Sequence, residues 1–249
     1  FTPLDTPVIE ASEVLLAKGG GETEKQIYRF QKGDADLALR FDLTVPLAKY
    51  VALHAGDLTF PFRRFQIGKV YRGERAQRGR FREFYQADID VIGDGKLDIS
   101  NEAEIPAIIY QAFTRLGLKR FQIRVNNRKV LNGFYAMLGL TEKSGEIMRT
   151  VDKLDKIGAD GVKKELLEKE FDAAAVEALD EFLCAGDFSL DAVTARVGDE
   201  TLTADLRYVI ATAEKIANGR YGIAYAPSLV RGQGYYTGMV FEVTCPQFS

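Results

Sequence analysis

One segment, residues 62–92, constrains the fold of this 249-residue chain more than any other. It reads FRRFQIGKVYRGERAQRGRFREFYQADIDVI, two strand-like runs around a basic loop that contains glycine. Eight basic residues stand between Arg63 and Arg82 against one acidic residue, Glu74, whereas the whole chain has a formal net charge of −3. Because an acidic chain gathers its arginines in one hairpin-sized stretch, we predict that this stretch binds phosphate oxygens.

The two strands of this hairpin are predicted at 65–72 and 81–92. Side chains alternate along the second strand, which places them on opposite faces. One face would carry Gln86, Asp88 and Asp90, and the other Ala87, Ile89 and Val91. Since a buried charge must be paired, the polar row is either a solvent-facing side of the strand or the floor of a polar pocket. The neighbouring arginines favour the pocket.

The arginine-rich loop has plainer interpretations as well. Basic surface loops are commonly solvated, or bind nucleic acid nonspecifically through its backbone phosphates. Here Gly73, Gly79, Phe81 and Phe84 are interleaved with the arginines, which indicates a fixed geometry. Arginine also orients a phosphate through two parallel hydrogen bonds, which lysine cannot do. Nucleotide binding is therefore the favoured interpretation.

The histidine and cysteine content narrows the possible chemistry. His54 is the only histidine, which argues against Ser-His-Asp catalysis and against a metal site built from several histidines. Cys184 and Cys245 are far apart and lack metal-ligand spacing, which suits a reducing cytoplasm. No apolar run approaches the ~20 residues that span a bilayer, and no secretory signal is visible. We expect a cytoplasmic location and no membrane partner.

Turn and cap signals outline the other elements of the first half. A hairpin is predicted around a turn at Gly33–Asp34. A helix should follow from Thr44, its N-cap, to near Gly56, and another from its cap Ser100 to Gly117. Strands joined by short turns, with helices grouped separately, predict an α+β fold around an antiparallel sheet.

The composition changes near residue 130, where the chain becomes rich in Ala, Glu and Lys with helical spacing of its apolar residues. Ile147 to Ile157 follow such a period, with Gly158 behind them. We interpret this region as a helical subdomain inserted into a β-rich core. The predicted organisation is a core in two parts, 1–129 and 206–249, around the helical insertion 130–205.

A third group of residues lies in the segment LVRGQGYYTGMVFE, residues 229–242. Arg231 stands between an apolar run and a glycine turn, followed by Tyr235 and Tyr236. The glycines approximate a dinucleotide-binding fingerprint, but Gly238 comes one residue too late and the segment runs into a strand. Ordinary packing on a sheet is the alternative for the two tyrosines.

Four ordered segments together resemble the class II aminoacyl-tRNA synthetases, and within them the histidyl family. The match extends over nearly the whole chain. Its four segments are LRFDLTVP at 39–46, VYRGER through to the aspartate at 70–90, NNRKVL at 126–131 and LVRGQGYYTG at 229–238. The resemblance implies the class II fold, an antiparallel sheet flanked by helices, with an inserted helical subdomain. It also implies that the chain begins within the first class motif and ends before the third motif and the anticodon-binding domain.

The family's residue roles are carried over by position. Arg72 would hold the α-phosphate of ATP and Arg80 its γ-phosphate, with Glu74 near the adenine. Arg231 would assist catalysis where other class II enzymes rely partly on a metal. Gly234 stands where many family members have aspartate. The substrate histidine would lie among Asp42, Thr44, Arg72, Gln86, Asp90, Tyr235 and Tyr236.

The activity that the resemblance implies is that of a ligase: ATP-dependent activation of L-histidine to histidyl-adenylate, then transfer to tRNA(His). ATP would enter with Mg²⁺ bound mostly through its phosphates, with no metal site from the protein alone. A homodimer is expected. The alternative is the non-catalytic regulatory subunit of ATP phosphoribosyltransferase, which has the same fold. The presence of Arg72, Arg80 and Arg231 favours the synthetase, and a simple nucleic-acid-binding module would leave the carboxylate strand unexplained.

Overall fold

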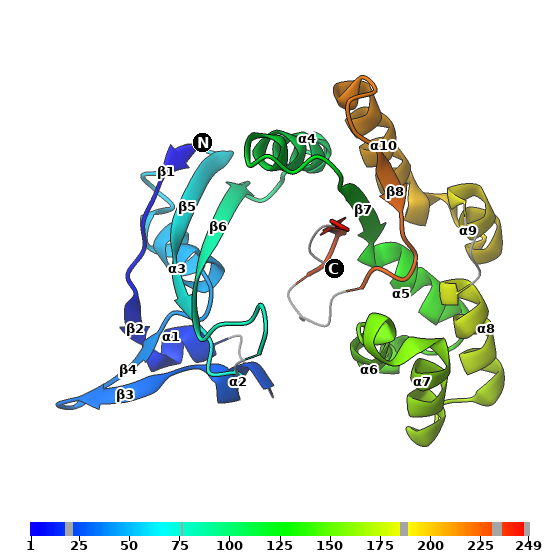
Figure 1. The fold of residues 1–249 in the computed structure, drawn as a ribbon, viewed down its shortest axis with the longest axis horizontal. Coiled ribbons are helices and arrows are strands. Elements are labelled where there is room, and N and C mark those ends of the chain that lie inside the picture. Colours follow the sequence, from blue (N-terminus) through cyan, green and yellow to red (C-terminus); the bar gives the residue numbers. More distant parts are fainter. Residues whose placement is uncertain (18–21, 76, 185–188, 231–235, 247–249) are drawn as a thin grey trace. The chain divides into compact units, whose positions relative to one another are not determined.

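The structure is a computed structural model that divides into two compact units, residues 1–97 and 98–249, each described by itself (Figure 1). It describes residues 1–17, 22–75, 77–184, 189–230 and 236–246. Within these ranges no helix combines the length and the apolar character needed to cross a membrane.

A long antiparallel hairpin is the main feature of the first unit (Figure 1). It consists of β5, Phe62–Tyr71, and β6, Glu83–Ile92, with the short β1, Thr2–Pro3, parallel to β5. The predicted strand pair is confirmed, although β5 begins and ends slightly earlier and β6 begins slightly later than expected. The two strands pair along their whole length.

A second sheet of the first unit has the strand order β2-β4-β3 and is antiparallel throughout. The hairpin predicted around Gly33–Asp34 is confirmed, and Gly33 has the positive φ of 60° that such a tight turn favours. The strands are β2 (Ile9–Ala11), β3 (Arg29–Lys32) and β4 (Ala35–Leu39). The helices are α1 (Ser12–Leu16), α2 (Glu22–Gln26) and α3 (Thr44–His54).

Both predicted helix N-caps were wrong, because a nearby aspartate takes the capping role. Thr44 is the first residue of α3, and Asp42 Oδ1 accepts a hydrogen bond from Val45 N at 3.0 Å. At the start of α4, Ser100–Arg115, Asp98 Oδ1 accepts from Ser100 N at 2.9 Å. An aspartate carboxylate satisfies the free amides of a first turn as well as a hydroxyl does.

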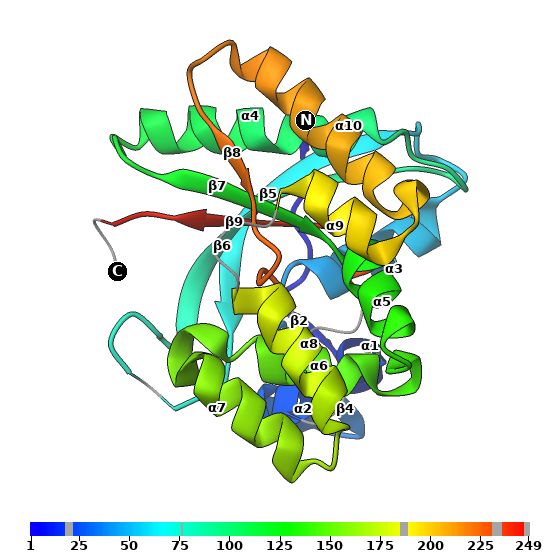
Figure 2. The same cartoon turned by 90° about the vertical axis from the view of Figure 1, so that its right-hand side faces the viewer.

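The second unit contains one three-stranded sheet and most of the helices. Its central strand β7, Gln122–Asn127, runs parallel to β8, Ile223–Tyr225, and antiparallel to β9, Met239–Thr244. Helix α10 packs against α4 (Figure 2). The remaining helices are α5 (Arg128–Met137), η1 (Thr141–Lys143), α6 (Ser144–Val151), α7 (Leu154–Glu168), α8 (Ala173–Cys184), α9 (Leu190–Val197) and α10 (Glu200–Ala217).

Helices and strands of the second unit share a large hydrophobic core. Val125 of β7 and Met239 of β9 belong to the same buried cluster as Leu206 of α10. Phe134 of α5 and Phe182 of α8 stack within it, with ring centroids 3.9 Å apart. The predicted end of the helical insertion at 205 lies inside α10, and the boundaries of the insertion stay a prediction. The α+β class itself is confirmed.

The helical period from Ile147 to Ile157 belongs to two helices rather than one. Helix α6 ends at Val151 and α7 begins at Leu154. Gly158, expected behind the period, interrupts α7 with a non-helical φ of 70°. Periodicity alone does not reveal the break between α6 and α7, because Val151 and Leu154 on its two sides pack in the same core. Ile157, counted in the same period, is 40% exposed.

Candidate functional site

Arg72 directly follows β5 and is held on several sides. Its guanidinium lies over the rings of Phe41 and Phe84, 4.5 and 5.0 Å from their centroids. Nε donates to Phe41 O at 3.3 Å and Nη2 donates to Gln86 Oε1 at 3.2 Å. Contact with two rings and two hydrogen bonds restrains the guanidinium before any ligand arrives. Such an arginine can orient an anion with little further loss of side-chain freedom.

The polar row of β6 lies on the more buried face of the hairpin. Gln86, Asp88 and Asp90 are partly buried, and they share their face with the fully buried Arg64 of β5. Tyr85, on the opposite face, is 67% exposed. The interpretation of this row as a solvent-facing side is therefore wrong, since the row is partly buried, Asp90 pairs with the buried Arg64 and Asp88 accepts from Gln86.

The orientation of the Gln86 amide follows from its two neighbours. Nε2 donates to both carboxylate oxygens of Asp88, each at 3.1 Å, and Oε1 accepts from Arg72. A carboxylate accepts only and a guanidinium donates only, so the oxygen of the amide must face Arg72. Gln86 thereby connects the arginine to the carboxylate row.

Asp42 belongs to the same electrostatic environment, although it comes from the turn between β4 and α3. Burial raises the pKa of its carboxyl above the usual value, the charge of Arg72 lowers it, and the charge of Asp88 raises it. Thr44, two residues further on, is exposed at the start of α3. The structure thus places Asp42 near Arg72 and Asp88, and leaves Thr44 on the surface of its unit.

Asp90 is the carboxylate that pairs with the buried Arg64. Its Oδ2 lies 2.8 Å from Arg64 Nη2. Burial raises the pKa of the Asp90 carboxyl, and the charge of Arg64 opposes that rise. Sequence reasoning counted Arg64 only as one of many phosphate-binding arginines. The signal that could have singled it out is strand register, which sets Arg64 directly opposite Asp90.

Arg40 is a second buried arginine that sequence reasoning missed. Its Nε donates to Lys69 O at 2.7 Å and its Nη1 donates to Thr6 O at 2.6 Å. It passes over Gly68 of β5, where an added Cβ would lie 2.5 Å from Arg40 Nη2. Since Arg40 precedes Phe41 and Asp42 directly, it fixes their segment against the hairpin.

Two predicted ATP-binding residues, Glu74 and Arg80, lie in the loop between β5 and β6. They pair with each other, with Arg80 Nη1 3.1 Å from Glu74 Oε2. Gly79 has a positive φ of 77°, and the backbone groups of Gln77 and Arg80 pair beside it in a tight turn. The interleaved glycine therefore supports a formed loop. The assignment of these residues to phosphate and adenine stays a prediction.

In the second unit, the predicted residues Arg231 and Tyr235, and also Gly234, lie outside the described residues. Tyr236 is described: its carbonyl oxygen accepts from Arg128 Nη1 at 2.9 Å. The backbone N–H of Arg128 donates to Gly238 O at 2.9 Å. The NNRKVL segment is thus bonded to the backbone of Tyr236 and Gly238, on both sides of Thr237.

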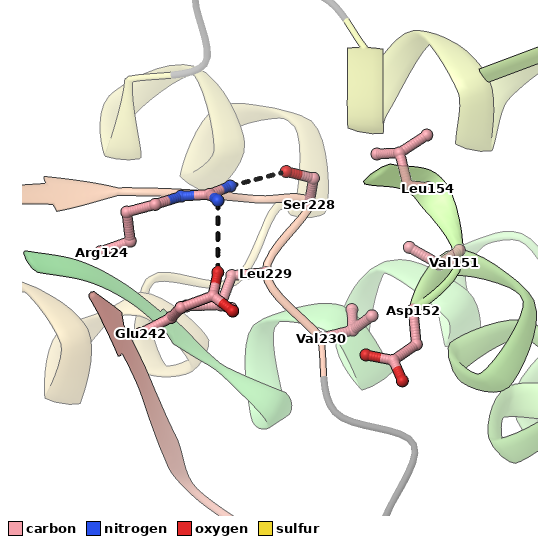
Figure 3. A pocket seen from close by; sticks show the side chains of 8 residues that line it. All are labelled: Arg124, Val151, Asp152, Leu154, Ser228, Leu229, Val230 and Glu242. Carbon is pink, nitrogen blue, oxygen red and sulfur yellow. Dashed lines mark hydrogen bonds and ion pairs between the residues drawn. The ribbon is translucent and has the colours of Figure 1, made fainter. Parts of the chain in front are cut away.

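A small pocket of ≈ 30 Å³ lies in the second unit, lined in part by residues 228–230 (Figure 3). Arg124 donates into it, with Nη1 3.3 Å from Glu242 Oε2 and Nη2 3.3 Å from Ser228 Oγ. The other side is formed by Val151, Asp152 and Leu154, at the junction of α6 and α7. This volume suits a water molecule or two and is too small for an amino acid.

A long antiparallel hairpin that carries a stacked arginine and a row of carboxylates, in an α+β chain with a helix-rich second unit, defines the class of protein: it has the class II aminoacyl-tRNA synthetase fold. The model of the family described as "Histidyl-tRNA synthetase" matches residues 1–249. The chain belongs to the histidyl-tRNA synthetase family.

Curated relatives agree with this assignment. The chain is 50% identical over 253 residues to a histidine–tRNA ligase of Clostridium tetani, covering 97% of this chain and 56% of that protein. It is 44% identical to a histidine–tRNA ligase of Finegoldia magna, covering 97% of this chain and 58% of that protein. The chain thus spans somewhat more than half the length of these relatives.

Solved structures share the fold. A histidyl-tRNA synthetase from Nostoc sp. PCC 7120 matches with a TM-score of 0.83 at 36% identity, covering 98% of this chain and 57% of that one. A protein from Bacillus halodurans, described as an ATP phosphoribosyltransferase regulatory subunit/histidyl-tRNA synthetase, matches with a TM-score of 0.80. It is 23% identical and covers 99% of this chain and 64% of that one, so it shows the fold alone.

Proposed function

We propose that the protein containing this chain activates L-histidine with ATP to histidyl-adenylate and transfers the histidyl group to tRNA(His). The observation that carries the proposal is the Arg72 arrangement: a guanidinium that contacts two aromatic rings and donates to Gln86, near the carboxylates of Asp42 and Asp88. It offers an anion-binding group and a cation-binding group within one unit.

The first step needs placement and charge stabilisation more than a protein nucleophile. The substrate carboxylate attacks the α-phosphorus of ATP in line, the bond to the β-phosphate oxygen breaks, and pyrophosphate leaves. In this proposal Arg72 bonds the α-phosphate oxygens, where negative charge develops. Arg80 and Glu74 hold the γ-phosphate and the adenine, Arg231 assists at the reacting centre, and Mg²⁺ accompanies the ATP phosphates.

The charge of the amino-acid side of the site fits an α-amino acid. Around the polar row of β6, three of the carboxylates named above stand against two guanidinium groups, and together these five carry one net negative charge. These groups are Asp42, Asp88, Asp90, Arg64 and Arg72. An ammonium group would neutralise that charge. Gln86, Asp90, Thr44, Tyr235 and Tyr236 complete the proposed histidine pocket.

The test is ATP–pyrophosphate exchange by the full-length protein with each amino acid in turn. We expect exchange with histidine and none above background with the others. Absent exchange, or exchange supported equally by several amino acids, would contradict the proposal. Charging of tRNA(His), assembly as a homodimer and a cytoplasmic location belong to the same proposal, and light scattering tests the dimer.

The same assay separates the synthetase from its alternative, a regulatory subunit of ATP phosphoribosyltransferase. The regulatory function has support only from fold likeness at 23% identity. A regulatory protein that binds histidine would give calorimetric histidine binding without exchange. The stacked Arg72, which a purely regulatory histidine site does not require, favours the synthetase.

A further inference from the structure

Arg64 has no assigned role, yet it lies at the centre of the carboxylate side of the site. Its side chain is fully buried on β5, opposite Asp90 on β6. Nη2 lies 2.8 Å from Asp90 Oδ2 and 3.4 Å from Leu43 O, to which it donates. Nη1 donates to Gln66 Oε1 at 3.2 Å. One guanidinium therefore connects β6 to the backbone between Asp42 and Thr44.

The charge of Arg64 also acts on the carboxylate that it faces. Burial and the charge of Asp88 raise the pKa of the Asp90 carboxyl, and the charge of Arg64 opposes that rise. The buried guanidinium therefore favours the ionised form of Asp90, and an ionised carboxylate accepts hydrogen bonds only.

We propose that Arg64 is a positioning residue of the amino-acid pocket, which fixes Asp90 and the Asp42–Thr44 backbone in one arrangement and keeps their carboxylates available to the substrate's cationic groups. The inference rests on the proposed function, because it assigns that pocket to the amino acid. Arg64 contacts neither substrate nor ATP in this account, and it acts through Asp90 and Leu43.

A purely structural role is the competing explanation, since removing a buried arginine can destabilise a hairpin. The two roles differ in their kinetic effect. A structural defect in the hairpin disturbs Arg72 as well and impairs the use of ATP and of histidine together. Loss of positioning impairs the use of histidine, because Arg64 bonds to Leu43 and Asp90 and not to Arg72.

The experiment compares Arg64→Met with Arg63→Met in the full-length protein, by ATP–pyrophosphate exchange. Arg63 is the adjacent arginine on the opposite face of β5, where it lies over the ring of Phe1. We expect Arg64→Met to raise the histidine KM roughly tenfold or more, the effect of losing one charged hydrogen bond, and to leave the ATP KM within about twofold. Arg63→Met should leave both constants within about twofold.

Two further variants separate positioning from stability. Arg64→Met/Asp90→Asn also removes the Asp90 carboxylate, which Arg64→Met leaves without its ion-pair partner. We therefore expect the double variant to unfold at a higher temperature than Arg64→Met while the histidine KM stays raised. Should Arg64→Met fail to fold, Arg64→Lys keeps the charge but lacks the planar guanidinium with its two donor arms. It should still raise the histidine KM with the ATP KM unchanged.

Equal increases in both KM values, or a histidine KM within twofold of wild type in the folded Arg64 variants, would overturn the inference. Recovery of the histidine KM together with stability in Arg64→Met/Asp90→Asn would also overturn it. A wild-type protein that shows no histidine-dependent exchange contradicts the proposed function itself. The two failures are therefore distinguishable.

Discussion

Gly68 gives the sharpest structural prediction, because its missing side chain makes room for a buried arginine. In Gly68→Ala the new Cβ would meet Arg40 Nη2 at 2.5 Å, well inside van der Waals contact. Arg40 would have to withdraw from Lys69 O or from Thr6 O, or from both. Both are short hydrogen bonds from a charged donor, and the guanidinium is buried.

The expected cost follows from the number of bonds lost. A hydrogen bond to a charged group contributes roughly 1.5–3 kcal/mol, so losing one costs about that and losing both costs roughly 3–6 kcal/mol. The backbone of Arg40 also accepts a hydrogen bond from Tyr71 N at 3.0 Å. The backbone amides at the end of β5 should therefore become less protected against hydrogen exchange when Arg40 moves.

Native-state hydrogen exchange of the β5 amides measures this directly, because local opening is detected without unfolding the other unit. A loss of 1.5–3 kcal/mol corresponds to exchange roughly 10–150 times faster at Tyr71. Gly56→Ala is the matched control, since Gly56 has no positive φ and no heavy atom lies within 4 Å of its added Cβ. Unchanged exchange at Tyr71 in Gly68→Ala, or an equal loss in Gly56→Ala, would refute the reasoning.

Two other perturbations test the site and the helical region. Arg231→Ala should depress adenylate formation far more than histidine binding, and calorimetry that finds binding lost while turnover is intact would show the role to be wrong. Glu165 accepts hydrogen bonds from Lys153 and Lys169, which lower the pKa of its carboxyl to about 2. Its contribution to the free energy of unfolding is therefore complete above the ordinary pKa of a glutamate carboxyl. That contribution is lost as the pH falls from the ordinary pKa toward 2. At pH 7 Glu165→Gln should cost about 1 kcal/mol after screening, and the difference in unfolding midpoint from wild type should shrink by pH 3; a difference independent of pH would count against the ion pairs.

The sequence predicted the hairpin well because two local signals agree in it. Alternation along 81–92 and the glycine-containing basic loop both require an antiparallel pair, and register then places the polar row on one face. That register sets Arg64 opposite Asp90, whereas the contact of Arg72 with Gln86 also depends on the course of the chain just after β5. Asp42 joins them through the packing of a separate segment, which only the family resemblance indicated.

The buried Arg40 was beyond local reasoning, because its partners are distant in sequence. Arg40 is bonded to Thr6, 34 residues earlier, and to Lys69, 29 residues later. Arginines are usually exposed, so composition predicts that they lie on the surface. The sequence of a single strand does not distinguish an arginine that faces water from one that faces a carboxylate. The cap predictions failed for a different, local reason: Asp42 and Asp98, two residues before the predicted caps, accept the hydrogen bonds instead of Thr44 and Ser100.

The central claim is that Arg72 serves the reacting phosphate, and single-turnover formation of histidyl-adenylate by Arg72→Ala tests it most directly. Arg29→Ala is the control, since Arg29 is an arginine of the same unit that pairs with Asp36 on the surface. The account predicts a rate roughly 10²–10³ times lower for Arg72→Ala and a rate near wild type for Arg29→Ala. A near-normal rate for a folded Arg72→Ala protein, or equal losses in both variants, would contradict it.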